Sequence, residues 1–230
     1  MIAIITARGG SKRIPKKNIK DFMGKPMLAY AIEAAKESGI FDELMVSTDS
    51  EEIAEVAKRC GAVVPFMRSK ETSSDFATTY DVLEEVLAEY GKQGKKFNTL
   101  CCIYPCVPFL TAKTLVEAYS QFTKNSADAL QPVCKYPAPV EWAMRIENGF
   151  LIPDDRKSQS LRSQDLSPRF YDAGMFYFLK TDVMLEEMSI TPKNTLGYVI
   201  DEAECQDIDT PDDWRMAELK YKILRKMQDA

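Results

Sequence analysis

The chain has 230 residues, of which 45% are hydrophobic and 28% are charged, and its formal net charge is −5. These values are ordinary for a globular protein with a buried core. The acidic balance argues against nucleic-acid binding over the general surface. The sequence contains no histidine, which excludes catalytic triads and metal sites that need imidazole. Any chemistry must therefore use carboxylates, lysines, arginines, backbone amides or a hard metal ion.

No apolar segment is long enough to span a membrane, and Met1–Ile5 lacks the charged region that precedes the core of a signal peptide. The six cysteines show none of the paired spacings of zinc sites, which is typical of buried free thiols in a reducing compartment. We therefore expect a cytoplasmic protein with no membrane partner.

Apolar segments alternate with segments of helical period, which predicts an α/β fold built on a sheet. Strands are expected at Ile2–Thr6, Glu43–Thr48, Ala62–Phe66, Leu100–Tyr104, Asp128–Cys134 and Ala173–Leu179. Helices are expected from Pro26 to Gly39, from a capping box at Asp49 and Glu52 to Gly61, from Thr78 to Tyr90, from Thr111 to Lys124, and from Thr210 onward. Polar caps, prolines at the first turn and glycines after the last turn mark these helices.

The regular alternation fails from about residue 135 to residue 170, where prolines and polar residues interrupt the pattern. Excursions of this length are commonly functional or form interfaces. Apolar residues interleaved with charges suit an arm that packs on a second subunit, and twofold dimers are the commonest oligomers: Trp142, Met144, Ile146 and Phe150. A hairpin packed within one chain is the alternative. The sequence thus predicts one domain over residues 1–230 with an extended dimerisation arm.

A strongly basic loop follows the first expected strand and carries Arg8, Lys12, Arg13, Lys16 and Lys17. A loop that leaves a parallel strand emerges at the sheet edge where α/β proteins bind their ligands. Gly9 and Gly10 let backbone amides approach an oxyanion closely, and Ser11 adds a hydroxyl. The loop therefore predicts a triphosphate site, although it is neither a Walker A loop nor a GxGxxG loop. A merely solvated basic loop is the alternative.

The segment Arg8–Ile19, followed by Gly24-Lys25-Pro26, resembles the signature of the CMP-sialic acid synthetase (acylneuraminate cytidylyltransferase) family. Three further motifs of that family follow in order: Val46–Ala54, Pro65–Arg68 with Asp75, and Asp207–Thr210. The matches extend from residue 4 to residue 225 and so cover essentially the whole chain. The resemblance implies a Rossmann-like, mixed and mostly parallel sheet of the nucleotidyltransferase (GT-A-like) type. It also implies a nucleotidyltransferase that uses CTP.

The resemblance assigns roles to residues of these motifs. Arg8 and Lys16 would steady the phosphates and act in catalysis together with Asp209. The positions implied to bind CTP are Gly9, Gly10, Ser11, Lys12, Asn18 and Arg68. The usual Arg-Pro pair of the family is Arg68-Ser69 here. From local pattern alone, Asp75 and Thr78 are interpreted as caps of the next helix, and Asp49 as the cap of its own helix.

Asp207 and Asp209 flank one apolar residue. In an extended segment both carboxylates face the same way, while Ile208 points into the core. Magnesium prefers such oxygen ligands and is shared with substrate phosphates. By itself the pattern also fits a helix start at Asp209, but the resemblance implies that both residues bind Mg²⁺, with Mn²⁺ as a substitute.

Sugar recognition is expected in the later half of the chain. The block Arg162–Leu166, followed by Tyr171–Gly174, resembles the branch of the family that activates pseudaminic acid, a nine-carbon acidic sugar. Candidate substrate residues are Arg162, Gln164, Asp165 and Tyr104. Asp172 stands where related enzymes often carry histidine, so any role of that imidazole is lost or replaced. A polar loop without a ligand is the alternative for the block.

The resemblance therefore implies that CTP and pseudaminic acid are converted to CMP-pseudaminic acid and pyrophosphate, for surface glycan or flagellin glycosylation. Within the same chemistry, N-acetylneuraminate, legionaminate or a 3-deoxy-octulosonate remain as substrates. A glycosyltransferase with a similar sheet and metal motif is a second class. A nucleotide-sensing or scaffold protein without activity is a third.

Overall fold

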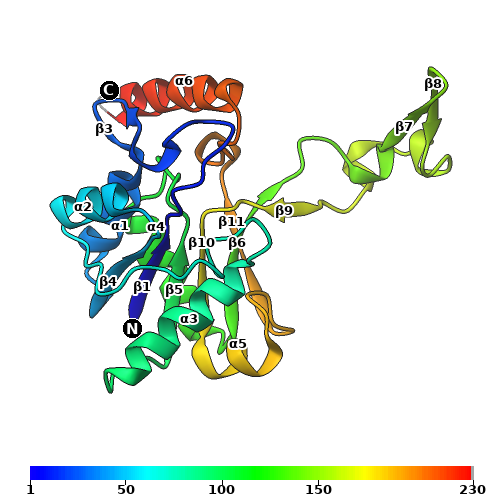
Figure 1. Cartoon of the computed structure of the whole chain (residues 1–230). Helices are drawn as coiled ribbons and strands as arrows, with labels where there is room; N and C mark the ends of the chain where they lie inside the picture. The colour runs from blue at the N-terminus through cyan, green and yellow to red at the C-terminus, as the bar shows by residue number, and fades with distance from the viewer. Residues whose placement is uncertain (229–230) are drawn as a thin grey trace.

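The computed structural model describes residues 1–228, and a mixed seven-stranded sheet lies at its centre (Figure 1). Its strands are β1 (Ile2–Thr6), β4 (Glu43–Ser47), β5 (Thr99–Ile103), β6 (Ala129–Lys135), β9 (Phe170–Asp172), β10 (Phe176–Lys180) and β11 (Thr195–Ile200). The order is β11-β6-β10-β5-β1-β4, and β9 pairs with β6. β1 lies parallel to β4 and β5, β11 lies parallel to β6, and β10 runs antiparallel to β5 and β6. The prediction of a mixed, mostly parallel sheet is confirmed.

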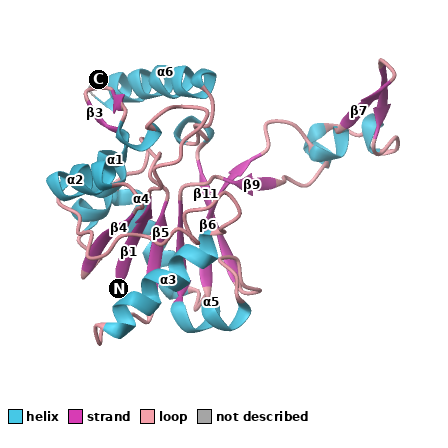
Figure 2. Ribbon diagram, in the orientation of Figure 1, coloured by secondary structure: helices cyan, strands magenta, loops and turns pink. Residues whose placement is uncertain are grey.

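Helices cover both faces of the sheet, and Figure 2 shows α3 and α5 on the near face. The helices are α1 (Met27–Ser38), α2 (Glu51–Cys60), α3 (Thr79–Lys92), α4 (Ala112–Lys124), α5 (Thr181–Glu187) and α6 (Pro211–Gln228). One buried cluster joins α1, α2 and α4 to alternate residues of the strands, such as Ile5 and Phe178. A second cluster joins α3 and α5 to the opposite face, where Ile4 and Tyr177 point. The apolar strand sequences follow from this burial on both faces.

A third buried cluster lies beneath the basic loop. It brings together Ile14 from the loop, Phe22 from β2 (Asp21–Phe22), Ile208, and Trp214 from α6. The Phe22 ring packs edge-on against Trp214, with ring centroids 5.3 Å apart. β2 pairs with β3 (Lys25–Pro26) as a short antiparallel ribbon before α1. This cluster fixes the segment around Ile208 against the start of the chain, although the two are about 200 residues apart.

Several expected elements differ in the structure. Ala62–Phe66 is not a strand: Val63 alone bridges to Met45, at the exposed sheet edge, and Pro65 has no N–H to extend the pairing. Ser50 caps α2, with its Oγ accepting a bond from Ile53 N at 3.4 Å, so the capping box expected at Asp49 is wrong. β10 begins only at Phe176, because Gly174 adopts a left-handed conformation with φ +61°.

Two elements of the structure, β11 and α5, were not predicted from the sequence. β11 is only partly buried and contains Gly197, so its residues do not alternate cleanly between apolar and polar. α5 spans seven residues, too few to display a helical period. The caps of longer helices were easier to predict: Thr78 makes a capping box with Asp81 before α3, and Thr111 caps α4.

The expected excursion forms an arm that projects away from the sheet (Figure 1). Its two stems pair at the sheet, where β9 lies antiparallel to the end of β6. Beyond them lies a hairpin of β7 (Met144–Glu147) and β8 (Phe150–Pro153). Arg145 pairs with Asp154 at 2.7 Å across this hairpin. Large apolar side chains of the hairpin stay exposed, among them Ile146 at 72% and Phe150 at 74%.

Replacing Phe178 by alanine is expected to lower the free energy of unfolding by about 3–5 kcal/mol, because its buried ring would leave a cavity in the core. The Phe178 side chain is fully buried and stacks with Phe122 at 6.0 Å. Phe76, which is 95% exposed, is the matched control. Its replacement by alanine should change stability by less than about 0.5 kcal/mol. Urea denaturation measures both; equal losses would contradict the assignment of the core.

Candidate active site

The basic loop leaves β1 and passes directly over the start of α2. Gly9 N donates to Asp49 Oδ1 at 2.7 Å. A Cβ atom at Gly9 would lie 3.1 Å from Ser50 Cβ, whereas one at Gly10 would meet nothing within 4 Å. Glycine at position 9 therefore allows the loop to pack on α2, and the open space at position 10 leaves the backbone accessible to a ligand. Asp49 holds the loop and does not cap its helix.

Asn18 fixes the same loop from beneath. Its side chain is buried, and its Nδ2 donates to the backbone oxygen of Arg8 at 2.9 Å. Cys106 Sγ donates in turn to Asn18 Oδ1 at 3.3 Å. Burial raises the pKa of the Cys106 thiol to about 12, so this donor stays protonated. Asn18 thus orients the loop backbone through Arg8.

Asp75 bridges two of the cations in the loop. Its Oδ1 accepts from Arg8 Nη1 at 3.0 Å, and its Oδ2 accepts from Lys12 Nζ at 2.6 Å. Lys12 and then Arg8 lower the pKa of Asp75, which keeps the carboxylate charged. The interpretation of Asp75 as a helix cap is wrong, because Thr78 caps α3.

The other three cations in the loop pair with different carboxylates. Lys16 Nζ lies 2.7 Å from Glu52 on α2. Arg13 Nη2 lies 2.7 Å from Asp209 Oδ2, and Lys17 Nζ lies 3.2 Å from Asp209 Oδ1. The loop is therefore a concentration of positive charge that is balanced by three separate parts of the chain, and a polyanion would compete for the same side chains.

Two cavities meet beside the loop. The first, of about 370 Å³, is lined by Asp209 and by much of the loop, but not by Gly9 or Lys16. The second, of about 240 Å³, contains Arg68 and Tyr104. Thr6, Arg8 and Pro105 line both cavities. Together they offer an elongated space with a cationic side, a shape that suits a nucleoside triphosphate.

Arg68 lies at the buried end of this space and is 8% exposed. Its Nε donates to Ser47 Oγ at 2.9 Å, and its Nη2 donates to Ser47 O at 2.6 Å. Desolvation lowers the pKa of Arg68 from its usual value. The bonds to Ser47 hold the guanidinium in one orientation, so it is a fixed donor at the cavity wall and not a mobile surface cation.

Tyr104 connects the second cavity to Asp172 through the core. Its OH lies 3.0 Å from Thr79 Oγ1, and its ring centroid is 5.4 Å from that of Tyr177. Tyr177 OH donates to Asp172 Oδ2 at 2.6 Å, and Gly174 N donates to Asp172 Oδ1 at 2.8 Å. The residue in place of histidine is thus a carboxylate that its neighbours hold in one orientation.

Ile208 is buried in the third cluster, as expected, but its two acidic neighbours line different cavities: Asp209 lines the cavity at the loop, and Asp207 does not. Desolvation, followed by repulsion from Asp209, raises the pKa of Asp207. Asp207 also lines a further cavity of about 300 Å³ together with Asp172 and Tyr171. Residues 1–228 contain no group of three or more Cys, Asp or Glu side chains arranged to hold a metal ion. The pair offers only oxygen donors whose charges repel, a donor set that fits Mg²⁺ shared with phosphates.

The three candidate sugar residues on the arm lie elsewhere. Arg162, Gln164 and Asp165 belong to the segment before β9, which Figure 1 shows projecting from the sheet. Gln164 lines a cavity of about 450 Å³ at the base of the arm, with Tyr136 and Arg169. Neither cavity beside the basic loop includes any of the three. Within one chain, the structure does not bring them to the loop.

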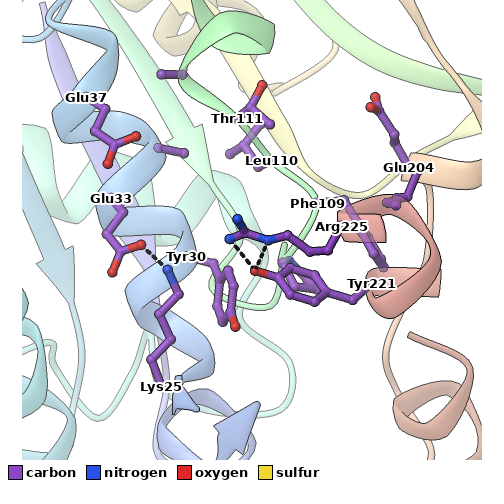
Figure 3. Close-up of a pocket in the computed structure, with 14 residues that line it drawn as sticks. Lys25, Tyr30, Glu33, Glu37, Phe109, Leu110, Thr111, Glu204, Tyr221 and Arg225 are labelled. Atoms are coloured by element: carbon purple, nitrogen blue, oxygen red, sulfur yellow. Dashed lines mark hydrogen bonds and ion pairs between the residues drawn. The ribbon is translucent and has the colours of Figure 1, made fainter. Parts of the chain in front are cut away.

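A further cavity of about 370 Å³ lies between α1 and α6 and is shown in Figure 3. An ion pair between Lys25 and Glu33 lies on one side, and Arg225 donates to Tyr221 OH on the other. None of the candidate site residues from the sequence lines it. We therefore assign the site to the cavities beside the basic loop.

Comparison with known proteins shows the family of the chain. The model of the cytidylyltransferase family matches residues 2–211. The chain belongs to that family. It is 40% identical over 223 residues to a pseudaminic acid cytidylyltransferase of Campylobacter jejuni, with 96% of both chains covered. It is 30% identical to a CMP-N,N'-diacetyllegionaminic acid synthase of Legionella pneumophila, with 100% of this chain and 98% of that protein covered.

The fold is shared with solved cytidylyltransferase structures. A CMP:2-keto-3-deoxy-manno-octonic acid synthetase complexed with CTP superposes with a TM-score of 0.70, covering 98% of both chains at 16% identity. The expected nucleotidyltransferase type of fold is therefore confirmed. No helix within residues 1–228 is both long and apolar enough to cross a membrane.

Sequence reasoning missed four residues that shape the site. Asp75 was interpreted as a cap, and Glu52 as part of a capping box. Cys106 and Tyr177 were not singled out, although they hold Asn18 and Asp172. Three of them act across a distance in sequence that local patterns do not report; Asp75 and Arg8, for example, are 67 residues apart. Tyr177 lies close to Asp172 in sequence. The family motifs gave a signal for two of them, because Glu52 lies in Val46–Ala54 and Asp75 follows Pro65–Arg68.

Asp207→Asn is expected to raise the thermal midpoint at neutral pH in the presence of a chelator. The pKa of Asp207 is higher in the folded protein than in the unfolded chain, because desolvation disfavours the charged carboxylate. The charge of Asp207 therefore destabilises the fold. This penalty is complete above the folded pKa and fades as pH falls toward the unfolded value of about 3.9, so the gain should shrink in acid. Differential scanning calorimetry across pH measures the effect.

Asp209→Asn is the matched control, because it removes the partner of Arg13 and Lys17. Asp209→Asn should not raise the thermal midpoint at neutral pH. A lower midpoint for Asp207→Asn than for the unchanged protein would contradict the assigned electrostatics.

Proposed function

We propose that this chain transfers the CMP group of CTP to pseudaminic acid, forming CMP-pseudaminic acid and pyrophosphate, and that it works in the cytoplasm. The observation that carries the proposal is the basic loop at the carboxyl end of β1, in a chain 40% identical over 96% of its length to a pseudaminic acid cytidylyltransferase. Both cavities beside the loop suit CTP, with the cytosine toward Arg68 and the phosphates toward Lys12.

The reaction requires an attack by the anomeric hydroxyl of the sugar on the α-phosphorus of CTP, with pyrophosphate as the leaving group. The chain's contribution is positioning and charge stabilisation. Arg8 can bind phosphate oxygens with two parallel N–H donors, and Lys12 and Lys16 neutralise charge as mobile cations. The amide at Gly10, open to the cavity, adds a fixed dipole.

Asp207 and Asp209 are the residues that would hold Mg²⁺. When bound, the ion would neutralise charge on the phosphates. Arg13 and Lys17, which pair with Asp209, keep this carboxylate in place beside the loop. Asp172, held by Tyr177 and Gly174, faces the cavity that also contains Asp207, which puts a carboxylate within reach of a sugar hydroxyl.

We also propose that the arm packs on a second copy of the chain. Its hairpin exposes Ile146 and Phe150 on a pair of strands with few contacts to the sheet domain. Arg162, Gln164 and Asp165 lie on the same arm, away from the loop of their own chain. In a dimer they would reach the sugar bound by the partner, with the fork of Arg162 on the sugar carboxylate.

The test is pyrophosphate release from CTP and Mg²⁺ with pseudaminic, N-acetylneuraminic and legionaminic acids supplied separately. Release with pseudaminic acid well above the other two is expected. Release chiefly with legionaminic acid would favour the second candidate, which rests on the 30% identity to a legionaminic acid synthase over the whole chain. No release from folded protein with any of the three would overturn the proposal.

Lys16→Ala should lower turnover by about 100-fold at saturating substrate, the effect of removing one preorganised charge stabiliser. Its side chain is 67% exposed, so stability should change little. Lys58→Ala is the matched control, because Lys58 is an exposed lysine that pairs with Glu55 on α2. Steady-state kinetics and thermal unfolding measure both variants. Turnover of Lys16→Ala near that of the Lys58 control would remove Lys16 from the mechanism.

A further inference from the structure

Asp75 bridges two cations of the basic loop, as Asp209 does with Arg13 and Lys17, but its partner Arg8 lines both cavities of the site. Asp75 accepts from two different cations at once, Arg8 at 3.0 Å and Lys12 at 2.6 Å. The backbone oxygen of its neighbour Ser74 also accepts from Arg8 Nη1, at 3.3 Å. Two oxygens of one carboxylate shared by an arginine and a lysine imitate the way in which a phosphate group is held.

The contact of Asp75 with Arg8 and Lys12 lies where the two cavities of the site meet. Arg8 lines both of them, Lys12 lines the cavity at the loop, and Asp75 lines the cavity that contains Arg68. A nucleotide that extends from Arg68 to Lys12 must therefore pass the point at which Asp75 binds Arg8. Phosphate oxygens of this ligand would reach the same N–H groups that Asp75 now occupies.

The loop that carries Asp75 is anchored on both sides. Before it, Ser69 N donates to Glu85 Oε1 at 2.9 Å, and Ser73 Oγ donates to Ser69 O at 2.6 Å. After it, Thr78 caps α3. The short segment between Ser73 and Thr78 is largely exposed. Asp75 can therefore leave Arg8 and Lys12 by a local movement that leaves the anchors intact.

The ion pairs of Asp75 with Arg8 and Lys12 are weak enough for a phosphate group to replace the carboxylate. The side chains of Arg8, Lys12 and Asp75 are 42%, 78% and 50% exposed, so their ion pairs stabilise the fold only slightly. A phosphate carries more negative charge and more acceptor oxygens than a carboxylate, so it wins the exchange. The apparent affinity for the phosphate is nevertheless reduced, because only the molecules in which Asp75 has left Arg8 and Lys12 can bind it.

We propose that Asp75 is an internal competitor of phosphate, which sets how tightly the basic loop holds CTP and pyrophosphate. It is a positioning residue, because it acts through Arg8 and Lys12. After the transfer step, Asp75 competes for these cations and so speeds the dissociation of pyrophosphate from the loop. The proposal rests on the proposed function only because it names pyrophosphate as the product. The competition between Asp75 and a phosphate does not depend on the identity of the sugar.

Asp75→Asn should bind pyrophosphate and CTP about three- to tenfold more tightly than the unchanged protein, because the competing charge is removed. The KM for CTP should fall, and kcat should fall or stay constant as pyrophosphate leaves more slowly. Asp75→Glu keeps the carboxylate and should retain the weaker binding. Isothermal titration with pyrophosphate and with CTP, at constant Mg²⁺ and ionic strength, measures the affinities without any sugar.

Glu71→Gln is the matched control. Glu71 is an exposed carboxylate on the same loop and makes no ion pair with any described residue, so the variant removes the same charge without opening the bridge. Binding by Asp75→Asn that is equal to or weaker than that of Glu71→Gln would overturn the proposal. If Asp75→Asn unfolds, Asp75→Ser is titrated in its place under the same criterion. Tighter binding together with no turnover on any sugar would uphold the competition and refute the proposed function.

Discussion

The turn by which the chain leaves β1 is the constraint on which the rest of the site depends. It is held from above by the bond between Gly9 N and Asp49, and from beneath by Asn18. A Cβ at position 9 would lie 3.1 Å from Ser50 Cβ, so a larger residue there would push the loop away from α2. With the backbone fixed in this way, four of the five cations line the cavity that follows β1, at the sheet edge where parallel sheets bind ligands: Arg8, Lys12, Arg13 and Lys17. Lys16 lies against Glu52 on α2 instead.

Concentrating five cations in one loop would be unfavourable without nearby anions. The fold supplies them from three segments far apart in the sequence, through Asp75, Glu52 and Asp209. The same carboxylates therefore serve two purposes. They reduce the repulsion within the loop, and they define how strongly an incoming polyanion must compete. Stability and ligand affinity are coupled here, because both depend on the same charged side chains.

Hydrophobic periodicity and capping residues predicted the strands and helices that depend on short-range interactions. The apolar strands and the capped helices α3 and α4 lie close to where the sequence indicates. Ala62–Phe66 has strand composition but makes only one bridge at the sheet edge, whereas β11, whose strand-like composition is interrupted by Gly197, pairs along its length with β6. For the site, the loop was evident from its charges and glycines. The role of Asp75 was not, since it depends on a fold-level contact with residues more than 60 positions away.

The arm differs from the sheet domain in that its apolar side chains are not buried within the chain. A two-stranded hairpin is marginal in water by itself, because it has no second layer against which to bury its apolar side chains. Here β7 and β8 keep Ile146 and Phe150 exposed, and the ion pair between Arg145 and Asp154 does not cover them. A second copy of the chain would provide the missing layer. The same contact would bring Gln164 and its neighbours toward another molecule's loop, so that sugar recognition and assembly would depend on one surface.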